Sequence, residues 1–221
     1  MDKRDNMGSL KWLTLVTVAL NGFIIVLDIS IVNISFPMLT RIFESEPSVV
    51  LWVSVVYSLI CVGLMPILGN IGDLYGRKRV FVLGYVLFTL GLVLCSLSNS
   101  IYQLIISRII QAVGGAMNMA LGFALVTNAF PANERGKALG IMASVFSIGP
   151  IAGVTLGGFL LDAIGWRSIF YMRAPICIIG IIMAWRLLRE NRPSDLDRTL
   201  DMPGAVALFG SLTSMLLFLN L

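Results

Sequence analysis

The stretch "GNIGDLYGRKRV" (69–80) separates two long apolar runs and decides how the rest of the sequence is interpreted. The runs cover 48–70 and 80–98. Each is long enough to cross a bilayer as a helix, which takes about 20 apolar residues. The cluster "RKR" (77–79) between them is typical of a loop on the cytoplasmic face of a membrane, where Lys and Arg accumulate. The sequence therefore predicts an all-α membrane protein.

Further apolar runs extend this pattern over most of the 221 residues. Six complete runs predict transmembrane helices at 11–37, 48–70, 80–98, 102–128, 137–161 and 168–188. We expect four parts: a cytoplasmic N-terminal tail (1–10), a six-helix bundle (11–188), a cytoplasmic linker (189–202) and the start of a truncated seventh helix (203–221).

The composition is that of a membrane protein and excludes several kinds of site. The sequence is 57% hydrophobic and 13% charged, whereas soluble domains carry about 25% charged residues. It contains no histidine, and its three cysteines are isolated inside apolar runs. We find no nucleophile–base pair, metal-ligand cluster or phosphate-binding glycine loop. We therefore expect no enzyme activity, no cofactor or metal, and no nucleic-acid partner.

The distribution of positive charge predicts the orientation in the membrane. Most of the 16 basic residues lie in the N-terminal tail and in the second, fourth and sixth connections, which all fall on one side. The side richer in Lys and Arg faces the cytoplasm. We expect a multi-pass protein of the plasma or inner membrane, embedded in the lipid bilayer with its N-terminus in the cytoplasm.

The first predicted helix carries a carboxylate, Asp28, in the middle of an apolar run. At about 100° per residue, its polar residues form one line within about 40° of Asp28, made of Thr14, Thr17, Asn21, Asp28 and Ser35. A polar line on a membrane helix faces protein or water rather than lipid. A structural contact between helices would explain the Ser and Thr residues, whereas an ionisable residue favours a functional site.

The fourth predicted helix offers a partner for Asp28. Its polar and glycine positions fall within an arc of about 80° and comprise Arg108, Gln111, Gly115, Asn118 and Gly122. Asp28 and Arg108 lie roughly 13 Å and 9 Å from the outer ends of their helices at 1.5 Å per residue. We hypothesise that both line one central cavity and interact electrostatically, directly or through water.

The fifth predicted helix contains a stripe of small residues, Gly149, Gly153 and Gly157, each four positions from the next. Such a stripe lets another helix approach closely, and Pro150 removes one backbone hydrogen bond and bends the helix. Ordinary tight packing explains the stripe as well as a special function does.

The connection quoted at the outset has a glycine and charge pattern that a plain basic loop does not explain. It reads G-x-x-x-D-x-x-G-R-K/R-x, which resembles the hallmark loop of the major facilitator superfamily. The matching positions are Gly69, Asp73, Gly76, Arg77 and Lys78, followed by Arg79.

Other stretches extend this resemblance to the N-terminal half of fourteen-span drug:proton antiporters. "LDISIVNISFP" (27–37) is similar to their first-span motif and "RIIQAVGGA" (108–116) to their fourth-span motif. "PANERGKALG" (131–140) resembles the connection that follows. "GPIAGVTLGG" (149–158) resembles their fifth-span motif, with Gly149, Pro150, Gly153, Gly157 and Gly158.

The resemblance implies a fold of two six-helix halves that rock around a central cavity. It implies that Asp28 and Arg108, with Gln111, Asn21 and Asn118, belong to the proton-coupling and substrate cavity. It also implies that the residues of the hallmark loop form a cytoplasmic gate against a C-terminal half, which the printed sequence lacks and which transport requires. The implied function is proton-coupled efflux of small hydrophobic or cationic compounds. Facilitated uptake of a metabolite, or a truncated remnant or membrane scaffold that transports nothing, are the alternatives.

Two positions depart from the resemblance. Val154 stands where a second proline is usual, and Arg173 stands where asparagine is common. We expect Arg173 to lie near the outer end of the sixth span, with its charged group reaching the membrane surface or adding charge to the mouth of the cavity.

Overall fold

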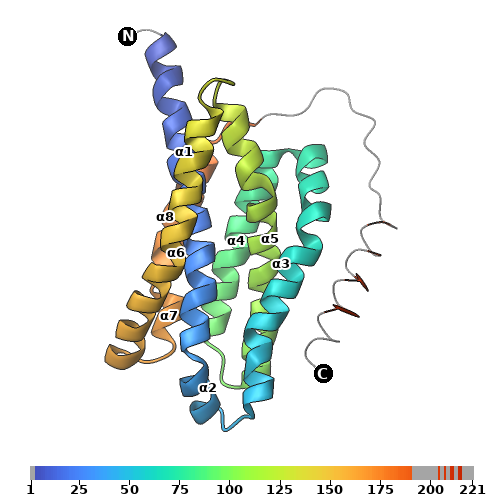
Figure 1. Ribbon diagram of the computed structural model, residues 1–221, viewed down its shortest axis with the longest axis vertical. Helices are drawn as coiled ribbons and strands as arrows, with labels where there is room; N and C mark the ends of the chain where they lie inside the picture. Colours follow the sequence, from blue (N-terminus) through green and yellow to red (C-terminus); the bar gives the residue numbers. More distant parts are fainter. Residues whose placement is uncertain (1–2, 191–203, 205–206, 208–209, 212–213, 216–221) are drawn as a thin grey trace.

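The computed structural model describes residues 3–190 together with 204, 207, 210–211 and 214–215 (Figure 1). The linker predicted at 189–202 lies outside the described residues from 191 onward. Most of the seventh helix predicted at 203–221 also lies outside them.

The described part is built from helices that run up and down a single bundle (Figure 1). Their bounds are α1 Lys3–Ile34, α2 Phe36–Ile42, α3 Pro47–Tyr75, α4 Arg77–Ser96, α5 Ile101–Ala129, α6 Arg135–Ala163, α7 Ser168–Tyr171 and α8 Ala174–Leu187. Within the described residues, six helical stretches are long and apolar enough to cross a membrane. The predicted all-α membrane fold is confirmed, and α1 already begins inside the predicted N-terminal tail.

Two helices bring the predicted polar faces together. The first, α1, packs against α5, α6 and α8, while α5 also packs against α3 and α4.

In Figure 1, the N-terminus of α1 lies at the same end of the bundle as the connections α3–α4 and α5–α6. We call this the basic end. The opposite end holds α2, α7 and the connection α4–α5 (Figure 1).

The last span is broken, although the sequence predicted one run over 168–188. The short helix α7 ends at Tyr171 and α8 begins at Ala174, with Pro175 in its first turn. Proline has no N–H to donate and suits the start of a helix, so it favours a new helix at this point. The break holds Arg173 at the N-cap position of α8, and this position decides where its side chain goes.

The glycine stripe of α6 faces α1. A side-chain carbon added at Gly153 would lie 2.8 Å from the carbonyl oxygen of Leu27, and carbons added at Gly149 and Gly157 would also meet α1. Gly158 points into open space instead. The small residues therefore let the two backbones approach closely.

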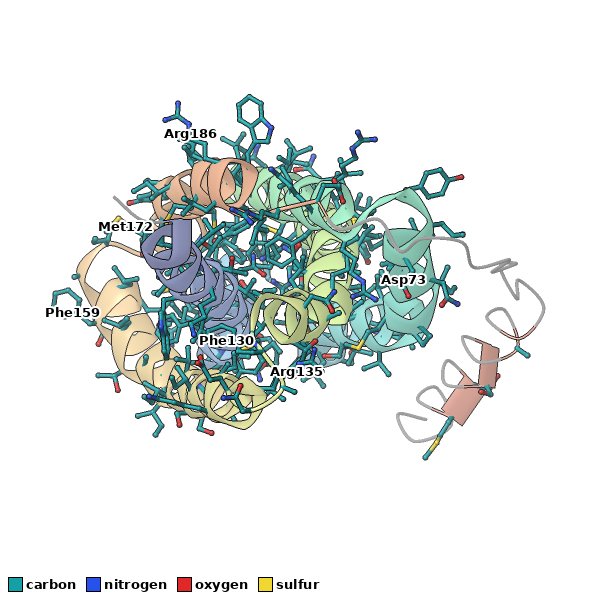
Figure 2. The ribbon with its side chains drawn as sticks, turned by 90° about the horizontal axis from the view of Figure 1, so that it is seen from above. Asp73, Phe130, Arg135, Phe159, Met172 and Arg186 are labelled. Carbon is teal, nitrogen blue, oxygen red and sulfur yellow. The ribbon has the colours of Figure 1, made fainter. Side chains whose placement is uncertain are left out.

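The outer surface of the bundle is apolar, as expected for contact with lipid. On α6, Ile151 and Phe159 are 70% and 69% exposed. Figure 2 shows Phe159 pointing away from the bundle, as does Arg186 of α8. Because exposed apolar side chains of this size are unfavourable in water, this surface fits a membrane environment.

Candidate functional site

Asp28 of α1 lies at the centre of a buried polar network. Its side chain is fully buried. Nη1 of Arg108 donates to one carboxylate oxygen at 2.5 Å, while Arg173 donates to the other oxygen. Nε2 of Gln111 also donates to that second oxygen at 3.1 Å. We call Asp28, Arg108, Gln111 and Arg173 the Asp28 network.

Arg108 ties the network to α3 as well as to α1. Its Nε donates to the carbonyl oxygen of Val53 at 3.1 Å, and its Nη1 also donates to Gln111 at 2.7 Å. The guanidinium carbon lies 4.1 Å from the centre of the Tyr57 ring, within reach of a cation–π interaction. One side chain of α5 therefore joins α1 and α3.

Of the two alternatives expected for Arg173, the one in which its charged group reaches the membrane surface was wrong. Its side chain is only 7% exposed and forms an ion pair with Asp28. Its Nε donates to the carbonyl oxygen of Ile169 in α7 at 2.6 Å. The break between α7 and α8 aims the side chain inward, where the carboxylate compensates its charge.

The network contains more positive than negative charge. Among the described residues, one carboxylate faces two guanidinium groups, one from α5 and one from the break before α8. Nη2 of Arg108 and Nη2 of Arg173 are buried and have no hydrogen-bond partner among the described residues. Burying a charge is costly unless it is paired and its donors are satisfied, so these two groups need an explanation.

The remaining residues of the α1 polar line divide into two kinds. Thr14, Thr17 and Ser35 are buried, and each hydroxyl donates to a backbone carbonyl oxygen of α1. Asn21 instead reaches across to α5. In the amide orientation that satisfies both of its ends, Asn118 accepts from Asn21 at 3.1 Å and donates to the carbonyl oxygen of Phe81 at 2.7 Å. These asparagines form a second polar layer, closer to the basic end.

The hallmark loop lies at the basic end, and Asp73, Arg77 and Arg79 form ion pairs there. Asp73 of α3 accepts from Nε of Arg77 at 2.7 Å, and Arg79 lies 3.6 Å from the carboxylate of Glu190. Gly76 has a φ of +106°, a backbone conformation that residues with a side chain rarely adopt. It is both the C-cap of α3 and the N-cap of α4. The glycine therefore permits the abrupt reversal between the two helices.

The other loop residues lie near this turn. Gly72 packs on Leu121 of α5, and Gly69 lies near Ala120. Lys78 is half-buried, and Figure 2 places Asp73 on the α3 side of the bundle.

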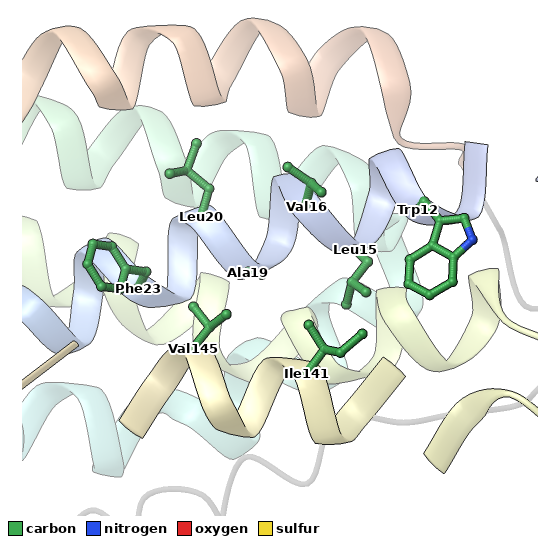
Figure 3. A pocket seen from close by; sticks show the side chains of 8 residues that line it. All are labelled: Trp12, Leu15, Val16, Ala19, Leu20, Phe23, Ile141 and Val145. Carbon is green, nitrogen blue, oxygen red and sulfur yellow. The ribbon is translucent and has the colours of Figure 1, made fainter. Parts of the chain in front are cut away.

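An apolar groove of about 380 Å³ lies between α1 and α6 (Figure 3). Its lining is entirely apolar and comprises Trp12, Leu15, Val16, Ala19, Leu20, Phe23, Ile141 and Val145. None of the predicted polar site residues lines it. Among the described residues, no cluster of His, Cys, Asp or Glu could hold a metal ion.

The sequence profile of the Major Facilitator Superfamily matches residues 18–219. The chain belongs to the major facilitator superfamily. As a member of this transporter family, with six apolar helices of membrane-spanning length in the part that the structure describes, it is a multi-pass integral membrane protein.

Two relatives and one solved structure illustrate the similarity. Riboflavin transporter RibZ of Clostridioides difficile is 40% identical over 94% of this chain and 45% of its own length. Multidrug resistance protein Stp of Mycobacterium tuberculosis is 37% identical over 90% of this chain and 37% of its own length. The crystal structure of peptide transporter POT shares the fold, with a TM-score of 0.73 at 14% identity, over 93% of this chain and 45% of that one.

The chain spans less than half the length of these relatives. This supports the predicted resemblance to the N-terminal half of a major facilitator transporter, and the multidrug-resistance relative supports the predicted branch.

Proposed function

We propose that this chain, as part of a longer transporter, exports small and mostly hydrophobic compounds in exchange for protons by alternating access. The observation that supports this most is the fully buried carboxylate of Asp28, which is held by groups from two other parts of the bundle. Ionisable residues inside a membrane are costly and mark ion or substrate pathways. The relative named as a multidrug resistance protein agrees with this kind of substrate.

A proton on Asp28 would act on several helices at once. It would cancel the negative charge that binds Arg108 of α5 and Arg173 before α8. Both ion pairs would weaken together, and α1 would be free to shift against α5 and α8. A charge change that biases a two-state packing arrangement is how such switches work. Proton binding at Asp28 would then select one of the two access states.

The surroundings favour hydrophobic compounds over cations. The family resemblance implied both kinds of compound, but a cation near Asp28 would also face two arginines. Like charges in a poorly hydrated site repel strongly. The apolar groove between α1 and α6 offers a surface for a hydrophobic compound instead (Figure 3).

The hallmark loop is the proposed gate. The Asp73–Arg77 ion pair and the turn at Gly76 form a compact structure at the basic end. In the full-length protein this end would meet the C-terminal half and open or close as the halves rock.

Facilitated movement of a metabolite is the second candidate. It is favoured by one finding, the 40% identity to a relative named as a riboflavin transporter. Such a function would need no coupling to protons, and the Asp28 network would then only hold the helices together.

The test is transport by the full-length protein in liposomes with a pH-sensitive dye inside. The probes are N-phenyl-1-naphthylamine as a neutral hydrophobic compound, ethidium as a cation and riboflavin as a metabolite. If the compound is exchanged for protons, a proton gradient should drive transport of the naphthylamine, and this transport should move protons in the opposite direction. An ionophore that collapses the gradient should stop both fluxes. Riboflavin flux that ignores the ionophore would support the second candidate. No flux of any probe would contradict both.

A further inference from the structure

The Asp28 network is short of one negative charge. Asp28 balances one guanidinium group, and Arg108 and Arg173 supply two. The other titratable side chains near it are Tyr57 and Cys61 of α3, Cys95 of α4 and Cys177 of α8. Phenol and thiol groups are uncharged in their ordinary form at neutral pH. None of these neighbours supplies the missing charge.

The unused donors belong to the two arginines. Arg108 uses Nε on Val53 and Nη1 on Asp28 and Gln111, and its Nη2 is left over. Arg173 uses Nε on Ile169 and Nη1 on Asp28, and its Nη2 is left over too. Each leftover Nη2 belongs to a guanidinium group that is bonded through its Nη1 to the carboxylate of Asp28, so both unused donors lie beside the same buried residue.

We propose that this region is an anion-binding site that takes a carboxylate, sulfonate or similar oxyanion group. Guanidinium groups bind such groups well, since their N–H donors match the spacing of two oxygens. An anion bound beside the network would accept from these unused donors and bring the network to zero net charge. The anion is either a free inorganic ion or the acidic group of a transported compound, and the two share the same chemistry.

The inference rests on the proposed function only in treating the network as the substrate-linked site. It adds a second class of compound, small organic acids, to the neutral ones proposed above. The acid would use the donors that Asp28 leaves over, so it would bind while Asp28 is ionised and keeps its own bonds to the arginines.

The test is thermal unfolding of the purified protein in detergent at neutral pH and constant ionic strength. The matched ligands are benzoate and benzamide, which differ in charge and hardly in shape, with sulfate as an inorganic anion. Benzoate at about 100 times its dissociation constant should raise the unfolding midpoint by about 5–10 °C. Benzamide should leave it unchanged.

Three variants make the result specific. Arg173→Asn removes the excess charge and should abolish the shift with benzoate, and Arg173→Lys keeps the charge but loses the planar fork and should reduce it. Arg186→Gln removes an exposed charge on the same helix and should keep the full shift. A shift with benzoate and sulfate supports a general anion site, and one with benzoate alone supports the acidic group of an organic compound.

Two outcomes would overturn the proposal. One is equal shifts with benzoate and benzamide, or none with either anion. The other is the same benzoate shift in wild type and Arg173→Asn. Neither outcome bears on the proton exchange of neutral compounds, which is measured as flux in liposomes.

Discussion

The excess positive charge of the Asp28 network predicts that substitutions of Asp28 and of Arg173 lower the stability of the protein by different amounts. Asp28→Asn leaves two buried guanidinium groups without a negative partner. Arg173→Asn leaves one carboxylate facing one guanidinium group, which is a balanced pair. The first variant should therefore be much less stable than the second, although each removes the same Asp28–Arg173 contact.

The size of the difference follows from the cost of unpaired buried charge. Removing one partner of a buried ion pair costs about 3–5 kcal/mol. Arg173→Asn removes two hydrogen bonds but leaves the remaining charges balanced, so it should lower the free energy of unfolding by about 1–2 kcal/mol. For a chain of this size, 1 kcal/mol lowers the unfolding midpoint by about 2–4 °C. We expect a fall of about 10 °C for Asp28→Asn and about 5 °C or less for Arg173→Asn. The double variant should be no less stable than Asp28→Asn alone, because the two residues share one interaction.

Three buried cysteines can report the unfolding of the protein. Cys61, Cys95 and Cys177 are all buried, at 5%, 0% and 0% exposure. A maleimide dye that fluoresces on reaction with a thiol will therefore report unfolding as these residues become accessible. Arg186→Gln, which neutralises an exposed arginine, controls for net charge.

One pattern of results would refute the charge count. In that pattern, Arg173→Asn would lower the unfolding midpoint as much as Asp28→Asn does, and the double variant would lower it by the sum of the two. The two residues would then contribute separately, and the network would not hold an excess positive charge.

Two further predictions use the same unfolding assay. Gly153→Ala should cost about 1–3 kcal/mol, since the added carbon would lie 2.8 Å from a backbone oxygen of α1, which cannot move aside. Gly158→Ala in the same helix faces open space and should stabilise slightly, by about 0.5–1 kcal/mol; equal losses in the two variants would show that the stripe does not set the α1–α6 distance. Gly76→Ala should cost about 1–3 kcal/mol, because φ is +106° there. Gly140→Ala, at an exposed helical position, is the control and should stabilise the protein by about 0.5–1 kcal/mol. An unchanged unfolding midpoint for Gly76→Ala would mean that the α3–α4 turn relaxes to accept the side chain.

The helices were predictable because the bilayer fixes their length and composition. The apolar runs gave six spans, and helical periodicity gave the buried faces of α1 and α5, so the contact between Asp28 and Arg108 could be anticipated. These features depend on spacing along one helix at a time. The functional role of the pair stays a prediction.

Arg173 shows what such reasoning could not supply. The direction of its side chain depends on the break before Ala174, whereas the apolar pattern predicts one continuous helix over 168–188 with Arg173 near its outer end. Pro175 was the available signal, because a proline marks the start of a new helix. The carbonyl of Val53 and the ring of Tyr57 were also missed as partners of Arg108. They depend on how α3 packs on α5, which no single-helix pattern contains.

The central claim is that protonation of Asp28 is linked to movement of the transported compound. The most direct measurement compares proton flux driven by N-phenyl-1-naphthylamine in liposomes that contain the full-length protein as wild type, Asp28→Asn, Asp28→Glu or Arg186→Gln. The account predicts flux in the wild type and Arg186→Gln, a reduced flux in Asp28→Glu, which keeps a titratable group, and none in Asp28→Asn. Proton flux in Asp28→Asn equal to that of the wild type would contradict it.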